Sequence, residues 1–173
     1  PNTFEELKED PEDPAKTRAA RSKKNSIYKQ LLTCPFCGKP LTEENFYIDI
    51  PTKSVSVYCS DKMCMYYKYK PSNKMKIPVY LVDEEIYAKC PTIILSTVDK
   101  FARLPWDVNT NALFGRVDRV CSRDGYVAIG ADHSRHNRTE ELPTSTLTPI
   151  KPFLPPELII QDELHLITGP LGT

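Results

Sequence analysis

The 173-residue sequence lacks a phosphate-binding loop. Its six glycines are scattered, and none belongs to a G-x-x-x-x-G-K-[ST] sequence, the loop whose backbone amides cradle nucleotide phosphates. The sequence printed here therefore cannot complete a nucleotide site of that kind, and we expect it to hydrolyse nothing on its own.

Long apolar runs and an excess of either charge are also missing. No run approaches 18 apolar residues, and the N-terminus has no basic-apolar-small signal pattern, so we expect a cytoplasmic protein without membrane association. Because 23 basic residues balance 23 acidic ones, nucleic-acid binding would have to come from local patches. Three patches stand out: the basic block 16–29, the lysines and tyrosines of 62–76 (Lys62, Tyr66, Tyr67, Lys68, Tyr69, Lys70, Lys74, Lys76), and the arginines Arg116, Arg119, Arg123, Arg135 and Arg138.

Six cysteines are present, and four of them form a set. Cys34 and Cys37 are a C-x-x-C pair followed by Gly38, and Cys59 and Cys64 are a C-x4-C pair. Two short-spaced pairs supply the four soft ligands that zinc takes in a tetrahedron. Residues 46–50 and 54–58 between the pairs alternate apolar and polar side chains, which predicts a β-hairpin and hence a zinc ribbon. Two disulfides or a redox C-x-x-C are the weaker alternatives, because no export signal and no βαβ context accompany them.

The other two cysteines have separate interpretations. Cys90 is most simply a packed thiol. Cys121 precedes His133 and His136, so a second metal site made of these three residues and one further ligand can be written, against the alternative of surface histidines in a loop.

The remaining segments predict an α/β protein. Residues 77–82, 91–95 and 158–161 are strand candidates, and the last two are continuous apolar runs typical of a buried parallel sheet. The run 91–95 leads into Ser96 and Thr97, where Thr97 can cap a helix that ends at Pro105. Residues 83–88 predict a short helix, and 106–156 an irregular stretch rich in arginine, glycine and proline.

The segment 158–161 is followed directly by the sequence Asp162-Glu163-Leu164-His165. A carboxylate pair at the end of a buried strand is suited to holding Mg²⁺ and polarising an attacking water, although acidic residues that cap a helix are the plainer alternative. Hydroxyls and free amides at Ser96 and Thr97 could likewise contact a phosphate backbone or merely cap the helix.

The strings PTIILSTVDKFARLPWD, ALFGRV and PPELIIQDELHLITGPLGT, in that order, resemble the superfamily 2 (DEAD/DEAH-like) helicases, most closely the large helicase component of bacterial DISARM anti-phage systems. The resemblance implies that Asp162, Glu163 and His165 are the catalytic motif II. It also implies that Thr97 and Lys100 belong to motif Ib, which touches the nucleic-acid backbone. Motif III and a second RecA-like domain have no counterpart in this sequence.

The residues themselves predict a charged helical or flexible lead-in (1–30) with a short first helix, followed by the zinc ribbon (31–70). The resemblance implies that this ribbon is an insertion and that 71–173 is part of a RecA-like parallel sheet with an insertion at 106–156. We expect ATP and Mg²⁺ as cofactors of the full-length protein, Zn²⁺ in the ribbon, and nucleic acid, chiefly DNA, and subunits of a defence complex as partners. The alternative is a non-catalytic zinc-ribbon module that binds nucleic acid or protein through Lys68, Lys70 and Lys74. A third option is that the ribbon only braces the sheet.

Overall fold

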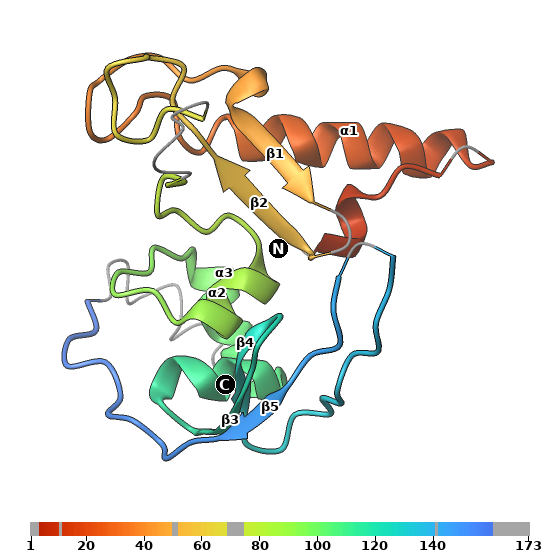
Figure 1. Cartoon of the computed structure of the whole chain (residues 1–173), viewed down its shortest axis with the longest axis vertical. Helices are drawn as coiled ribbons and strands as arrows, with labels where there is room; N and C mark the ends of the chain where they lie inside the picture. The colour runs from red at the N-terminus through yellow and green to blue at the C-terminus, as the bar shows by residue number, and fades with distance from the viewer. Residues whose placement is uncertain (1–3, 11, 50–51, 69–74, 141, 161–173) are drawn as a thin grey trace. The chain divides into compact units, whose positions relative to one another are not determined.

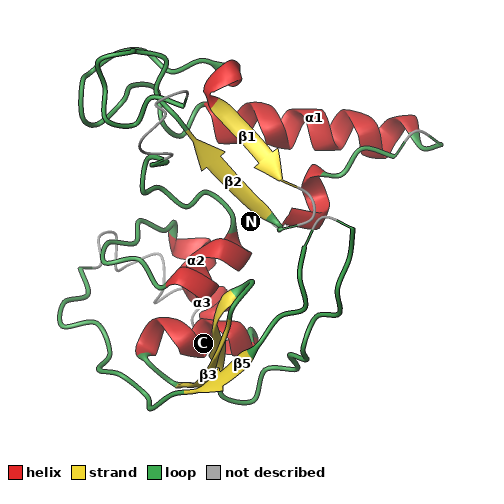
Figure 2. Ribbon diagram, in the orientation of Figure 1, coloured by secondary structure: helices red, strands yellow, loops and turns green. Residues whose placement is uncertain are grey.

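The computed structural model describes residues 4–10, 12–49, 52–68, 75–140 and 142–160. The chain divides into two compact units, Pro1–Ile86 and Tyr87–Thr173, called here the N-terminal and C-terminal units. Helices and strands are mixed, and the sheets formed by the described residues are small and antiparallel (Figure 1, Figure 2). None of the described helices is long and apolar enough to cross a membrane.

The N-terminal unit begins with a single 3-10 turn, Phe4–Leu7, followed by the 15-residue helix α1, Pro14–Tyr28. The side chain of Asp13 accepts hydrogen bonds from the amides of Ala15 and Lys16, and a proline at the first helical position needs no amide partner. The first helix is short, as expected, but the basic block after it is a regular helix anchored by the buried Ile27.

The predicted hairpin is present. Strands β1 (Phe46–Asp49) and β2 (Ser54–Val57) pair antiparallel with Phe46 opposite Val57, after a 3-10 turn at Glu43–Asn45 (Figure 1). Val55 and Val57 point inward and are fully buried, while their neighbours on β2 are partly exposed. This alternation is the period of two that the sequence showed.

The outer edge of β2 is closed by two later residues. The Ile77 amide donates to the Val57 carbonyl at 2.8 Å, and the Val55 amide donates to the Glu85 carboxylate at 2.9 Å. The strand predicted for 77–82 is wrong beyond Ile77, because residues 78–82 form no strand. Pro78 has no backbone amide hydrogen with which to continue the hydrogen-bond ladder. Helix α2 follows at Asp83–Lys89, where a short helix was predicted.

The C-terminal unit is built on the sheet β4-β3-β5, with β3 at Val117–Cys121, β4 at Gly125–Ala128 and β5 at Leu147–Pro149 (Figure 1). This sheet lies inside the stretch 106–156 that the sequence suggested was irregular. Helix α3 (Val98–Arg103) begins after Thr97 as predicted, but it continues through Pro105 as a 3-10 turn, Leu104–Trp106, before a second one at Val108–Phe114.

Gly115 joins the last 3-10 turn to β3. It has a φ of 73°, and an added Cβ would lie 2.0 Å from the Phe153 carbonyl oxygen. Only glycine permits both this backbone conformation and this close approach. The contact ties the residues after β5 back to the start of β3.

The two apolar runs expected to be buried parallel strands are neither strands nor buried in the described residues. Ile93 and Leu95 are 79% and 94% exposed, and Leu158 and Ile160 are 74% and 84% exposed. A parallel strand needs hydrogen-bonded neighbours and cover on both faces, and the described residues supply neither to these runs. The described part of the chain therefore contains no RecA-like parallel sheet.

Glu85 generates a test of the N-terminal unit. Its carboxylate is only 5% exposed, accepts the Val55 amide and lies 3.6 Å from the Lys76 ammonium. Replacing Glu85 by alanine leaves the buried Val55 amide without an acceptor. Glu85→Ala should therefore lower the free energy of unfolding by about 2–4 kcal/mol in urea titrations. Glu85→Gln keeps an acceptor and should lose less. The exposed Glu43→Ala serves as control, and equal stability of the Glu85 and Glu43 variants would refute the assigned role.

Candidate metal centre

Four cysteine thiols converge in the N-terminal unit. The sulfurs of Cys34, Cys37, Cys59 and Cys64 all lie within 4.8 Å of one another. The first pair comes from the loop after α1, and the second follows β2, so the hairpin brings together two pairs that have 21 residues between them. This group could bind a metal ion such as zinc.

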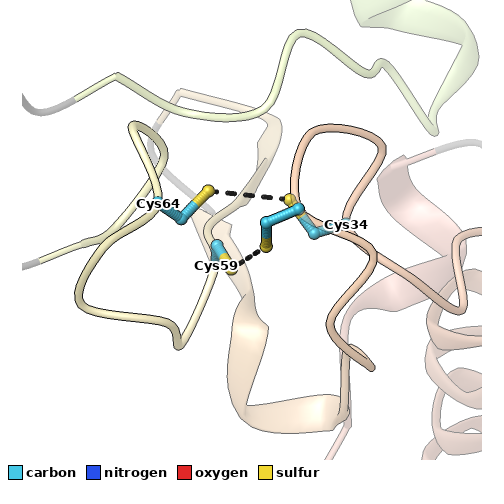
Figure 3. Close-up of side chains that lie close together, drawn as sticks. Cys34, Cys59 and Cys64 are labelled. Carbon is cyan, nitrogen blue, oxygen red and sulfur yellow. Dashed lines mark hydrogen bonds between the residues drawn. The ribbon is translucent and has the colours of Figure 1, made fainter.

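The spacing of the sulfurs fits a tetrahedral ion rather than disulfides. Cys34 Sγ lies 3.8 Å from Cys64 Sγ (Figure 3), and Cys37 Sγ lies 3.5 Å from Cys59 Sγ. A tetrahedron with zinc–sulfur bonds of about 2.3 Å has edges of about 3.8 Å. A disulfide would need about 2.05 Å, and all four cysteines are free thiols.

Backbone amides support the sulfurs on both sides. Gly38 has a φ of 72°, and its amide donates to the Cys34 carbonyl at 2.9 Å, which closes the turn that carries the first pair. On the second pair, the Asp61 amide donates to Cys59 Sγ at 3.4 Å. Amides aimed at sulfur stabilise thiolates and orient them, as metal-binding knuckles require.

The surroundings shift the thiol pKa values in different directions. Burial raises the pKa of Cys59 to about 12 and also raises that of Cys64. Burial acts to raise the Cys34 pKa as well, but the amides of Cys37 and Phe36 and the neighbouring thiols outweigh it and leave that pKa below its usual value. Cys34 is thus the first of these three thiols to lose its proton.

The cysteines belong to the core of their unit. Cys34, Cys59 and Cys64 are at most 2% exposed. They share one buried cluster with Leu7, Ile27, Leu41, Phe46, Val55, Val57, Ile77, Leu81 and Val82. A metal ion here would join the loop after α1, the hairpin and the segment that leads to α2.

The basic and aromatic surface expected beside the ribbon is partly described. The Lys68 ammonium lies 3.4 Å from the centre of the Tyr47 ring, and Tyr47 packs edge-on against Tyr58 at 5.5 Å. Tyr66 instead packs edge-on against Phe36 and contacts the core. Lys70 and Lys74 lie outside the described residues.

The helicase-like positions are only partly visible. Thr97 is exposed at the start of α3, and its side chain makes no capping hydrogen bond, while its carbonyl accepts the amides of Lys100 and Phe101. Lys100 is partly buried. Asp162, Glu163 and His165 lie outside the described residues.

Two of the five arginines of the third patch brace a loop. Arg123 donates to the carbonyls of Asn137 and Pro143 at 3.2 and 2.6 Å, and Arg119 donates to the Ala131 carbonyl at 3.3 Å. These guanidinium groups hold the long connection from β4 to β5 against the β3–β4 hairpin.

Cys121, His133 and His136 converge, and they do so around a fourth residue that sequence reasoning missed, Asp124. The ligand atoms of these four residues all lie within 4.8 Å of one another. The spacing of the residues was the signal that could have identified Asp124. Cys121 and Asp124 have two residues between them, as do His133 and His136. Burial lowers the pKa of His133, so its imidazole is neutral at pH 7.

Cys90 belongs to neither group. It is half-buried and donates to the carbonyls of Tyr87 and Ala112 at 3.2 and 3.4 Å. Burial raises its pKa to about 11, which keeps the thiol protonated and unreactive. The interpretation as a packed thiol agrees with this environment.

Removing the first cysteine pair should remove one zinc ion and the order of the N-terminal unit. Binding of structural zinc and folding are coupled, with apparent free energies of about 10–16 kcal/mol in small zinc domains. Cys34→Ser with Cys37→Ser should lower the zinc content, measured by mass spectrometry of the metal, by about one ion per chain. Amides of β1 and β2 should also lose hydrogen-exchange protection. Cys90→Ser is the matched control, and a double variant with unchanged zinc would rule out this centre.

Comparison with known proteins adds a relationship. No protein-family model matches the chain. Over 151 residues, 85% of its length, it is 52% identical to the DISARM protein DrmA of Bacillus paralicheniformis, and the match spans 13% of that protein. The extent and identity of the match support a relationship between this chain and DrmA.

Proposed function

We propose that the chain is part of an ATP-dependent nucleic-acid helicase or translocase that acts in anti-phage defence. The observation that carries the proposal is the 52% identity to the DISARM protein DrmA over 85% of the chain. The D-E-x-H sequence at 162–165, directly after an apolar run, supplies the enzymatic part. In this proposal 31–70 is a zinc-ribbon insertion, and 71–173 belongs to a RecA-like domain with an insertion at 106–156.

The proposed roles follow from the chemistry of phosphoryl transfer. Asp162 would hold Mg²⁺ through a water, and Glu163 would polarise the water that attacks the terminal phosphate of ATP. His165 would link the nucleotide to a neighbouring domain. Phosphoryl transfer depends on positioning and charge neutralisation more than on covalent catalysis. In this proposal, the two carboxylates and the histidine are therefore all that this segment needs to contribute to the reaction. The ion neutralises charge on the phosphates when bound.

The exposed apolar runs support a sheet completed by other parts of a larger protein. Residues 93–95 and 158–160 each present large aliphatic side chains to solvent, and Leu95 and Ile160 are 94% and 84% exposed. Burying one such side chain contributes about 1.5–3 kcal/mol. Runs of this kind mark surfaces that pack against something else. As adjacent or nearby parallel strands they would bring Thr97 and Asp162 to one edge, where α/β sheets bind ligands.

The same arrangement gives Thr97 and Lys100 a role on nucleic acid. The Thr97 hydroxyl makes no capping bond and the residue is exposed, so it could donate to a phosphate oxygen. Such a contact carries no sequence information, which suits an enzyme that moves along a strand.

One observation favours a second function, a nucleic-acid-binding ribbon without catalysis. The Lys68 ammonium lies over the Tyr47 ring, and Tyr58 packs beside that ring, so a cation and two aromatic rings lie together at the hairpin. Cations beside aromatic faces bind single strands through phosphate contacts and base stacking. Lys70 and Lys74 would extend this surface.

The catalytic assignment is tested in the complete protein with Glu163→Gln. Loss of the carboxylate that orients the attacking water should lower ATP hydrolysis by at least about 100-fold while ATP binding, measured by calorimetry, is retained. Glu157→Gln, an exposed acid just before the apolar run, is the control and should hydrolyse ATP normally. Hydrolysis that survives Glu163→Gln at full rate would show that Glu163 has another role.

The ribbon surface is tested with the triple variant Lys68→Ala, Lys70→Ala and Lys74→Ala. If each lysine neutralises one phosphate, the plot of log affinity against log salt should become shallower by about 2 for single-stranded DNA. A charge-matched triple variant of exposed cations outside the three basic patches, Lys8→Ala, Lys89→Ala and Lys151→Ala, should keep the original slope. An unchanged slope in the ribbon variant would leave Thr97 and Lys100 as the contacts to examine.

A further inference from the structure

We propose that Cys121, Asp124, His133 and His136 form a second structural zinc site, located in the C-terminal unit and independent of the cysteine ribbon. The four residues offer one thiolate, one carboxylate and two imidazoles. This proposal does not depend on the helicase assignment, because it rests on the geometry of the β3–β4 hairpin and the loop after it.

The distances suit a tetrahedral ion. A site with bonds of about 2.0–2.3 Å has edges of about 3.3–3.6 Å between nitrogen, oxygen and sulfur ligands. The His133 Nε2 atom lies 3.5 Å from Asp124 Oδ2, which already matches. The His136 Nε2 atom lies 2.5 Å from the same oxygen, as a hydrogen bond. An entering ion would replace that bond and widen the pair by about 1 Å.

One ligand atom is buried without a hydrogen-bond partner. The Nε2 atom of His133 is inaccessible to solvent, and its 3.5 Å approach to Asp124 does not meet hydrogen-bond geometry. Buried polar atoms in native proteins nearly always have a partner, so an orphan calls for an explanation such as a bound ion. A metal bond to this nitrogen would supply the missing partner.

The surrounding chain holds the two ligand pairs in place. Cys121 ends β3 and Asp124 lies in the hairpin turn, while the two histidines lie in the long loop from β4 to β5. The His136 amide donates to Ser145 Oγ at 2.7 Å, and the Ser145 amide donates to the His136 carbonyl at 3.0 Å. Two short-spaced pairs on a hairpin and an anchored loop repeat the plan of the cysteine ribbon.

The composition of the ligand set indicates the metal and its role. Thiolate with imidazole favours zinc over the hard cations magnesium and calcium, which prefer oxygen. Because all four tetrahedral positions are filled by side chains, no position remains for a catalytic water, and the site is structural.

The described residues of the C-terminal unit form only a small apolar core. Its buried apolar residues are Ala112, Val117, Cys121, Val127, Ala128 and Ala131, none larger than valine. Small β units with a core of this size are commonly stabilised by a metal or disulfides. Of the described cysteines in this unit, Cys90 points to backbone carbonyls, so a metal is the cross-link that the side chains allow.

The test compares zinc content in the complete protein. The variant His133→Gln with His136→Gln should contain about one zinc ion fewer per chain than the wild type by elemental analysis, and Cys90→Ser should contain the same amount as the wild type. After cobalt substitution, the His variant should also lose part of the visible absorption of tetrahedral cobalt. The deficit should be additional to that of the Cys34 and Cys37 variant. Equal zinc in the His variant and the wild type would overturn the proposal.

A second measurement guards against a variant that simply misfolds. Asp124→Asn preserves the size of the side chain and an oxygen that can accept from His136, so the hairpin should remain folded in the absence of metal. It should nevertheless bind zinc at least about 10-fold more weakly at this centre in competition with a chelator. In the wild type, chelation should lower hydrogen-exchange protection of β3 and β4. Unchanged zinc affinity in Asp124→Asn, or protection of β3 and β4 that is indifferent to chelation, would mean that these residues form only a hydrogen-bonded cluster.

Discussion

The convergence of four cysteine sulfurs is the constraint on which the N-terminal unit depends. Three of these cysteines are buried within the same cluster as Ile27, Phe46 and the valines of β2. Burial raises the pKa of Cys59 and Cys64, so without an ion these thiols stay protonated and pack as small apolar side chains, whereas a bound cation would convert them to ligands and add metal–sulfur bonds to the cluster. The hairpin, the loop after α1 and the segment that leads to α2 meet there.

The sequence was sufficient where the determining contacts are local. Cysteine spacing predicted the four-cysteine cluster and apolar alternation predicted the hairpin, because each cysteine pair and each strand is a short local pattern and the hairpin between the pairs brings them together. Helix α1 was predictable too, since Asp13 and Pro14 are standard start signals; the dense basic charge obscured them. The fourth residue of the second group, Asp124, was overlooked although it lies only three positions from Cys121.

The sequence was insufficient where partners lie far away. The runs 91–95 and 158–160 have the composition of buried strands, but composition does not say which strand lies beside them, and the described residues leave both runs exposed. The stretch 106–156 looked irregular because its strands are only three to five residues long and its many prolines and glycines dominate the pattern. Under the proposed function these runs would pack against other parts of a larger protein; the match to DrmA spans 13% of that relative.

The mutual closeness of the four sulfurs determines how the cysteine centre would respond to an oxidant. All four lie within 4.8 Å of one another, and contacts between the two pairs are as short as 3.5 and 3.8 Å. Once the ion is lost, each thiol therefore has the other three within reach, and an oxidant that takes two electrons from two thiols would form a disulfide from two former metal ligands. Each such bond would remove two ligands at once, so zinc could return only after a reductant had restored the thiols.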